Sequence, residues 1–140
     1  MKVSLHYRGE GAAFDVENER GQRLVIDGSP ELGGRDLGAR PMEHVLFGLA
    51  GCAGMDVLHI IRKGRRELSR AVIEVDAVRA DAVPAVFERI HLTFDLSGEG
   101  VSQEIAERAV NLSIERYCSV ARMLQPHVEV TTTVRVSPPH

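Results

Sequence analysis

Two cysteines are the residues of this chain best suited to chemistry. Cys52 lies within the apolar run GLAGCAG, and Cys118 stands directly before a short helical segment at 119–124. A thiol at a helix N-terminus faces the positive end of the helix dipole, which predicts a lowered pKa for Cys118. Cys118 could equally be a resolving thiol. Cys52 could react, or it could pack as a small buried hydrophobic side chain.

The residues that share a helix face with Cys52 narrow the chemistry. Asp56 lies one turn after Cys52, and we expect it to pair with Arg or Lys of another element rather than to act in catalysis. His59 lies two turns on, about 10 Å along the axis, which argues against a direct Cys–His pair within this helix. The chain has no Cys-x-x-Cys and no four-ligand spacing of Cys and His. The sequence therefore predicts no metal site.

A long apolar helix is expected to carry Cys52. Pro41 suits the first helical position and Gly64 suits the end, so the pattern predicts a helix over 41–63. The segment is apolar on nearly every side from 45 to 58, as in a helix that is buried all round. A chain of 140 residues offers little with which to wrap such a helix, so we expect a second subunit to cover part of it.

The remaining elements indicate an α+β fold, with antiparallel sheets around this central buried helix. Runs of strands between helices, rather than alternating strands and helices, favour that class. A glycine-rich loop at 29–40 precedes the long helix, and Ser102 is the expected N-cap of a second helix. The expected strands are 2–7, 12–17 and 23–26 as an antiparallel meander, then 71–79, 86–96 and 128–136.

Composition limits the class of protein. The length of 140 residues, with 44% hydrophobic and 26% charged residues, fits one domain over 1–140. The net charge of −3 argues against a nucleic-acid partner. Asp56 and His59 interrupt the apolar helix, and the N-terminus MKVSLHYRGE has no apolar run, so we expect no membrane segment and a cytoplasmic location. Thiols stay reduced there, which favours redox chemistry over a structural disulfide.

Three segments, in order, resemble a known family. RPMEHVL followed by LAGCAGMDV is similar to the central helix of the osmotically induced protein C / organic hydroperoxide resistance (OsmC/Ohr) family. ERYCSVARML is similar to the family's second cysteine segment, and PAVFERIHL is similar to a family strand. The resemblance implies an OsmC-like α+β fold, an intertwined homodimer and sites at the dimer interface.

The resemblance also implies a thiol peroxidase that acts on organic hydroperoxides. Cys52 would attack the peroxide and become a sulfenic acid, and Cys118 would condense with it to a disulfide. A dithiol reductant, such as a dihydrolipoyl protein, would restore both thiols. The family's Arg–Glu pair matches Arg8, or alternatively Arg40, and Glu43, which stands one residue after the family's glutamate position. No cofactor is implied.

Two other functions fit the same residues. The protein could be a redox sensor, in which a disulfide changes shape or partner contact without turnover, and the loose match for the arginine favours this hypothesis. It could also be a dimer that binds a small ligand, in which Cys52 only packs. A disulfide would need the two Cα atoms within about 7 Å.

Overall fold

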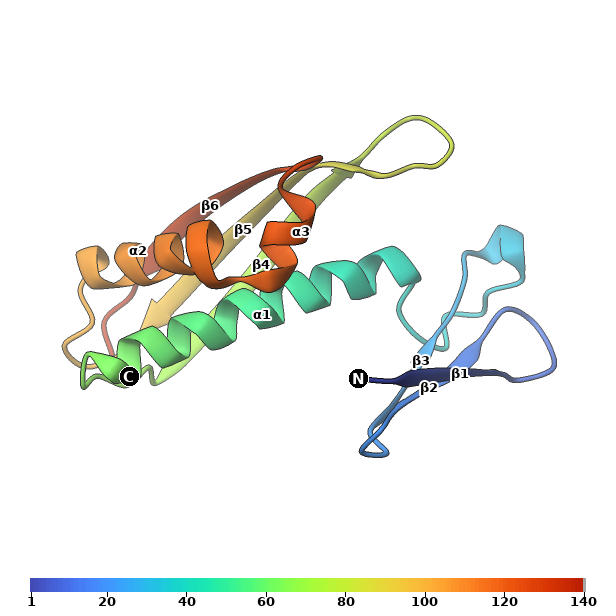
Figure 1. Ribbon diagram of the computed structural model, residues 1–140, viewed down its shortest axis with the longest axis horizontal. Helices are drawn as coiled ribbons and strands as arrows, with labels where there is room; N and C mark the ends of the chain where they lie inside the picture. The colour runs from blue at the N-terminus through green and yellow to red at the C-terminus, as the bar shows by residue number, and fades with distance from the viewer. Residues whose placement is uncertain (140) are drawn as a thin grey trace. The chain divides into compact units, whose positions relative to one another are not determined.

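The computed structural model describes residues 1–139. The chain forms two compact units, residues 1–47 and the residues from Gly48 onward, and each is described by itself; the single domain over 1–140 stays a prediction. The first unit holds β1 (Val3–Tyr7), β2 (Phe14–Asn18), β3 (Arg23–Ile26) and the 3₁₀ turn η1 (Pro30–Leu32). Helix α1 (Pro41–Lys63) begins there and continues into the second unit, which also contains β4 (Arg70–Arg79), β5 (Phe87–Ser97), α2 (Gln103–Leu112), the π-helical turn η2 (Ser113–Tyr117), α3 (Ser119–Leu124) and β6 (Glu129–Val136) (Figure 1).

The sheet of the second unit has the strand order β4-β5-β6. Strand β4 runs antiparallel to β5, whereas β6 runs parallel to it. The α+β class is confirmed, but the expectation of purely antiparallel sheets is wrong for β6. The reason lies in the connection: α2, η2 and α3 carry the chain back from the end of β5 to the start of β6, and a helical crossover of this kind joins parallel strands.

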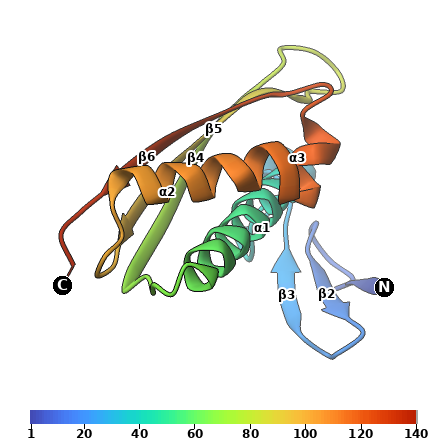
Figure 2. The ribbon, with the colours of Figure 1, turned by 60° about the vertical axis from the view of Figure 1, so that its left-hand side comes forward.

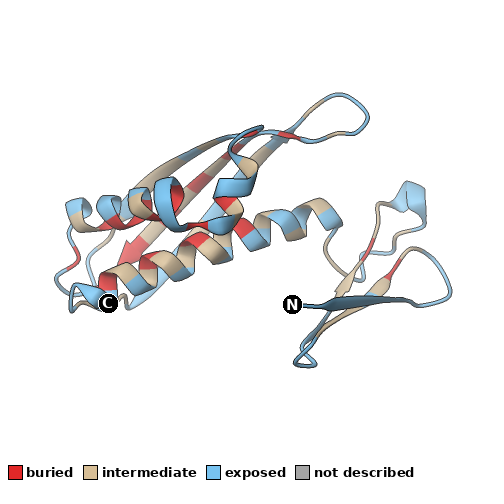
Figure 3. Ribbon diagram, viewed as in Figure 1, coloured by how far each residue is buried: buried red, intermediate tan, exposed pale blue. Residues whose placement is uncertain are grey.

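Helices α1 and α2 lie over one face of this sheet (Figure 2). Strand β5 alternates, so that every second side chain is buried on that face. Helix α1 buries one residue in every four. These buried residues, together with the buried residues of α2 and β5, form the core (Figure 3). Each fully buried aliphatic side chain contributes about 1.5–3 kcal/mol. The core residues on these three elements are Leu49, Ala53, Val57, Ile61, Phe87, Ile90, Leu92, Phe94, Leu96, Ala106, Ala109 and Val110.

Local signals placed the two long helices correctly. The predicted range 41–63 for α1 is confirmed. The expected N-cap of α2 is also confirmed, because the Ser102 hydroxyl accepts a hydrogen bond from the Ile105 N–H at 3.2 Å.

Helix α1 is buried along one side only within this chain. Phe47 is 59% exposed and Met55 is 71% exposed. A methyl group added at Gly48 or Gly51 would meet open space, whereas one at Gly54 would come within 2.8 Å of the Ile73 side chain. This agrees with the expectation that a chain of this length does not cover the helix on all sides, and the second subunit that would cover the rest stays a prediction. By length and composition α1 is also apolar enough to cross a membrane, a test that the core helix of a soluble protein passes as well.

The first unit is a small antiparallel meander, as predicted. Its strands are paired so that the apolar side chains gather on one face of the sheet. These side chains are only partly covered: Leu5 is 48% exposed, Tyr7 53% and Leu24 47%. We call this surface the apolar β1–β3 face; it comprises Leu5, Tyr7, Phe14, Val16, Leu24 and Ile26.

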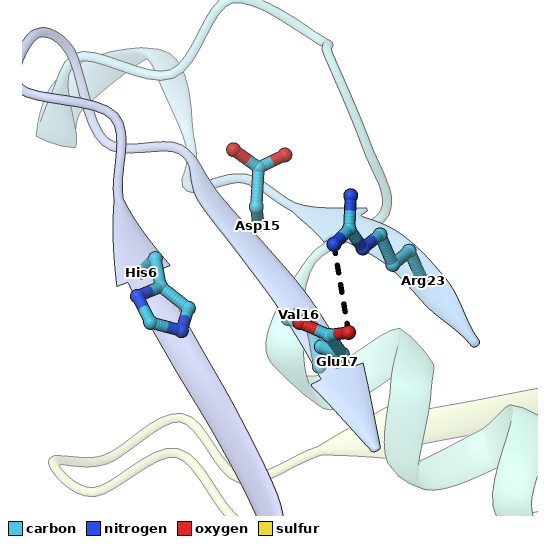
Figure 4. A pocket seen from close by; sticks show the side chains of 5 residues that line it. All are labelled: His6, Asp15, Val16, Glu17 and Arg23. Atoms are coloured by element: carbon cyan, nitrogen blue, oxygen red, sulfur yellow. Dashed lines mark ion pairs between the residues drawn. The ribbon is translucent and has the colours of Figure 1, made fainter. Parts of the chain in front are cut away.

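The opposite face of the same sheet is polar. Charged side chains surround a hollow of about 450 Å³ there, and Arg23 forms an ion pair with Glu17 at 3.5 Å (Figure 4). Asp15 and His6 line the same hollow. The small sheet is thus amphipathic, with one face suited to water and the other suited to burial.

Candidate active site at the paired cysteines

The two cysteines are neighbours in the fold. Cys52 lies half-buried on α1, and Cys118 is buried between η2 and α3. The two sulfur atoms and a carboxylate oxygen of Asp56 all lie within 4.8 Å of one another. Both thiols are free, and a disulfide bond of about 2.05 Å would require the sulfurs to approach by at most about 2.8 Å.

The π-helical turn η2 delivers Cys118 to this place. The Cys118 N–H donates to the Ser113 carbonyl at 2.7 Å, which closes the turn. Cys118 then adopts an extended conformation as the N-cap of α3, where its sulfur accepts the Ala121 N–H at 3.4 Å. Turns of this wide type occur frequently at functional sites. Here the turn ends α2 and reorients the chain at Cys118.

Burial decides the protonation of Cys118. It raises the pKa of the thiol from 9.0 to about 11, and the adjacent Cys52 adds to the rise. The Ala121 N–H favours the thiolate but has a smaller effect. The predicted lowering of the Cys118 pKa is therefore wrong, because the side chain is only 2% exposed and desolvation outweighs the helix N-terminus. Cys118 keeps its proton at neutral pH.

Asp56 is part of the cluster, contrary to its expected role. Its carboxylate accepts a hydrogen bond from the Ser113 hydroxyl at 2.9 Å, and residues 1–139 provide no ion pair for it. The predicted salt bridge to Arg or Lys is wrong, because this side of α1 meets the hydroxyl of η2. Asp56 also lines a cavity of about 480 Å³ together with His59, Lys63 and Tyr117. Solvent therefore reaches the carboxylate.

Sequence reasoning underestimated this part of the site. The four-residue spacing from Cys52 to Asp56 is a usable signal that the two side chains are neighbours, although the same position on a helix also suits a salt bridge. Nothing in the sequence marked Ser113. Its position depends on the π-helical turn, which has no recognised local pattern of residue types.

Arg8 and Glu43 lie in the first unit, where both make local contacts. The Arg8 guanidinium pairs with Asp15 at 3.0 Å, which lowers the pKa of Asp15 and raises that of Arg8. The Glu43 carboxylate accepts the Arg40 N–H at 3.0 Å, next to the start of α1. Because the two units are described separately, the catalytic roles of Arg8, Arg40 and Glu43 stay predictions.

Comparison with known proteins agrees with the fold. A family model described as OsmC-like protein matches residues 33–133. Protein YhfA of Escherichia coli is 35% identical over 91% of this chain and 92% of its own length. A hypothetical protein from Aquifex aeolicus has a TM-score of 0.85 at 29% identity, covering 99% of this chain and 97% of that one. An organic hydroperoxide resistance protein OsmC from Legionella pneumophila has a TM-score of 0.68 at 20% identity, covering 96% and 95%, which shows a shared fold.

Proposed function

Because this chain belongs to the family of OsmC-like proteins, and because its two thiols are neighbours, we propose that it is a thiol peroxidase that reduces organic hydroperoxides. The observation that carries the proposal is the approach of the Cys52 and Cys118 sulfurs to within 4.8 Å. The name of the Legionella protein, organic hydroperoxide resistance protein, supports the substrate class.

The proposed reaction has three steps. The Cys52 thiolate attacks the O–O bond of ROOH; a sulfur–oxygen bond forms, and the alkoxide leaves and takes up a proton as ROH. The Cys118 sulfur then attacks the Cys52 sulfenic acid, which forms the S–S bond and releases hydroxide, and the Cys118 proton converts that hydroxide to water. A dithiol finally supplies two electrons and two protons and is itself oxidised to a disulfide. A dihydrolipoyl protein is the proposed reductant.

Asp56 is the proposed proton carrier of the second step. Cys118 is protonated at neutral pH because burial raises its pKa to about 11, so the thiol must lose that proton as it attacks. The Asp56 carboxylate lies within 4.8 Å of both sulfurs, and the Ser113 hydroxyl orients it. It is placed to accept the proton from Cys118 and to pass it to the leaving hydroxide.

The proposal keeps the sequence-based assignment of the activating residues and of the assembly. Arg8 and Glu43 are the proposed pair that stabilises the Cys52 thiolate, with Arg40 as the alternative cation. A homodimer is proposed as the active form. The partly exposed apolar β1–β3 face and the exposed Met55 on α1 support it, since monomeric proteins rarely expose large apolar patches.

The direct test is the consumption of cumene hydroperoxide by the reduced protein with dihydrolipoamide. We expect turnover in the wild type and none in Cys52→Ser or Cys118→Ser. Met123→Leu is the matched control, because Met123 is 69% exposed and its thioether could also be oxidised. Full turnover by Cys52→Ser would refute the mechanism, and loss of turnover in Met123→Leu would show that the thioether contributes.

A redox sensor is the second candidate. The observation in its favour is that Arg8 is paired with Asp15 within its own unit, so it would have to leave or share that carboxylate in order to serve the Cys52 thiolate. A sensor would form the Cys52–Cys118 disulfide with stoichiometric peroxide, but dithiols would not sustain turnover. The same assay separates the two functions, because it compares one oxidation event with repeated cycles.

A further inference from the structure

Three potential metal ligands meet at the cysteine pair, although the spacing in the sequence predicted no metal site. We propose that the reduced protein binds one Zn²⁺ ion through Cys52, Asp56 and Cys118, with the fourth position open to water. Zinc binding in itself does not require peroxidase activity.

The distances suit a tetrahedral ion. Zinc binds thiolate sulfur at about 2.3 Å and carboxylate oxygen at about 2.0–2.2 Å, so ligand atoms around it stand about 3.5–3.8 Å apart. The three donor atoms here all lie within 4.8 Å of one another. The donor atoms would therefore have to approach one another by at most about 1 Å, which side-chain rotation can provide. Two of the ligands share one face of α1, and η2 holds the third.

The electrostatics of the cluster favour a cation. The Asp56 carboxylate is half-buried beside two thiols, and its hydrogen bond from the Ser113 hydroxyl brings no positive charge. Both thiols would lose their protons on binding the ion, and the resulting two thiolates and one carboxylate carry three negative charges, which a divalent ion reduces to one. Lys63 lines the same cavity as Asp56.

The donor set selects zinc over other common ions. Mg²⁺ and Ca²⁺ require oxygen ligands, and two thiols exclude them. Cu(I) prefers sulfur ligands alone, whereas a set of two thiolates and a carboxylate suits the borderline ion Zn²⁺. Three protein ligands with one open position are also the arrangement found in zinc sites that keep a bound water.

Zinc binding would compete with oxidation of the same thiols. In the bound state both sulfurs are coordinated, so they react with peroxide more slowly than free thiolates do. An organic hydroperoxide that oxidises them takes two electrons: the two thiolates join as a disulfide, ROOH and two protons become ROH and water, and Zn²⁺ is released. The disulfide then lacks the thiolates needed to rebind the ion. Bound zinc would therefore protect the two reduced thiols, and oxidation by peroxide would release the zinc ion.

The experiment is a titration of the reduced protein with Co²⁺ followed by Zn²⁺, monitored by absorption. We expect one Co²⁺ per chain, a thiolate-to-cobalt charge-transfer band with the intensity of two thiolates, and full displacement by Zn²⁺. Cys52→Ser and Cys118→Ser should each lose the two-thiolate spectrum. Asp56→Asn should weaken Zn²⁺ binding by roughly tenfold or more. The protein oxidised to the disulfide should bind neither ion at this site.

Two variants serve as controls for this titration. His59→Gln removes a potential ligand from the same cavity, and Asp76→Asn removes an exposed carboxylate from β4; both should bind Zn²⁺ like the wild type. Absence of the two-thiolate band in the wild type would overturn the proposal, whether or not Asp56→Asn folds. An affinity unchanged in a folded Asp56→Asn would overturn the three-ligand site, and loss of binding in His59→Gln would show that the ligands are different.

Discussion

Cys118 combines a buried position with a thiol that resists ionisation. Its sulfur sits at a helix N-cap, yet desolvation controls the equilibrium and raises the pKa to about 11. A thiol that stays protonated is a poor initial nucleophile for a peroxide. It is better suited to attack a sulfenic acid, because Asp56 is proposed to accept its proton in that step. The different roles proposed for the two cysteines thus match their different burial.

The pH dependence of stability should reveal the buried Cys118 thiol. Its folded-state pKa of about 11 lies above the ordinary value of 9.0, so its contribution to stability is fully present below pH 9 and is lost as pH rises toward 11. The loss should be about 3 kcal/mol. We would measure the unfolding free energy in urea for the reduced wild type and for Cys118→Ala at pH values between 9 and 11. Over this range the value should fall by about 3 kcal/mol more in the wild type than in the variant. Parallel curves for the two proteins would contradict the high pKa.

Asp56→Asn should separate the two chemical steps at the cysteines. Loss of the carboxylate removes the proton acceptor for Cys118, so disulfide formation should slow by roughly a hundredfold, whereas attack of Cys52 on peroxide should change much less. Stopped-flow measurement of sulfenic acid, trapped with dimedone, would show a longer lifetime in the variant. The difference in the rate of disulfide formation between the variant and the wild type should decrease as pH approaches 11, where Cys118 loses its proton to solvent. Equal sulfenic acid lifetimes in the two proteins would exclude Asp56 from this role.

At the scale of elements, the sequence predicts the ends of the helices, because these depend on residues close by in the chain. Pro41 and Gly64 mark the ends of α1, and Ser102 caps α2, because these effects act within a few residues. The parallel direction of β6 was not predictable in this way, since it follows from the route of the helical crossover. The burial of Cys118 depends on packing between distant segments in the same manner, and it reversed the expected pKa shift.

The loop after β3 offers a prediction at this scale. The Asp27 side chain is only 2% exposed, and its carboxylate accepts the N–H groups of Gly28, Arg35 and Leu37 at 2.8–3.2 Å. These bonds lower the pKa of Asp27 and fold the loop around it. The stabilisation they provide should therefore be present at neutral pH and disappear in acid, as the carboxylate protonates.

Asp27→Asn should loosen this loop without unfolding the sheet. The amide has one accepting oxygen in place of two, so at least one N–H loses its partner. Oδ1 accepts the Gly28 N–H and Oδ2 accepts those of Arg35 and Leu37, so we expect amide exchange to accelerate by roughly tenfold either at Gly28 or at both Arg35 and Leu37, measured by NMR at neutral pH. The matched control is Asp36→Asn, because Asp36 has a φ of 56° in the same loop and Asn tolerates that conformation. Unchanged exchange in Asp27→Asn would show that the loop is held by other contacts.

At the scale of the whole molecule, apolar surfaces of the two units lack a cover within their own unit in the described residues 1–139. The apolar β1–β3 face exposes about half of Leu5, Tyr7 and Leu24, and α1 exposes Phe47 and Met55 beside open space at Gly48 and Gly51. Glycines within a helix cost about 1 kcal/mol each relative to Ala, a cost that close approach of another chain would offset. A second copy of this chain would provide such a cover, which is consistent with the proposed homodimer.

Two substitutions on the same strand test the dimer. Leu5→Glu places a charge on the apolar β1–β3 face, whereas Ser4→Glu places the same charge on the polar face next to it. We expect light scattering at micromolar concentration to give twice the chain mass of 15.4 kDa for the wild type and Ser4→Glu. Leu5→Glu should dissociate toward the chain mass, because a buried, unpaired carboxylate costs several kcal/mol at an interface. A monomeric wild type would refute the dimer, and a dimeric Leu5→Glu would place the interface elsewhere on the chain.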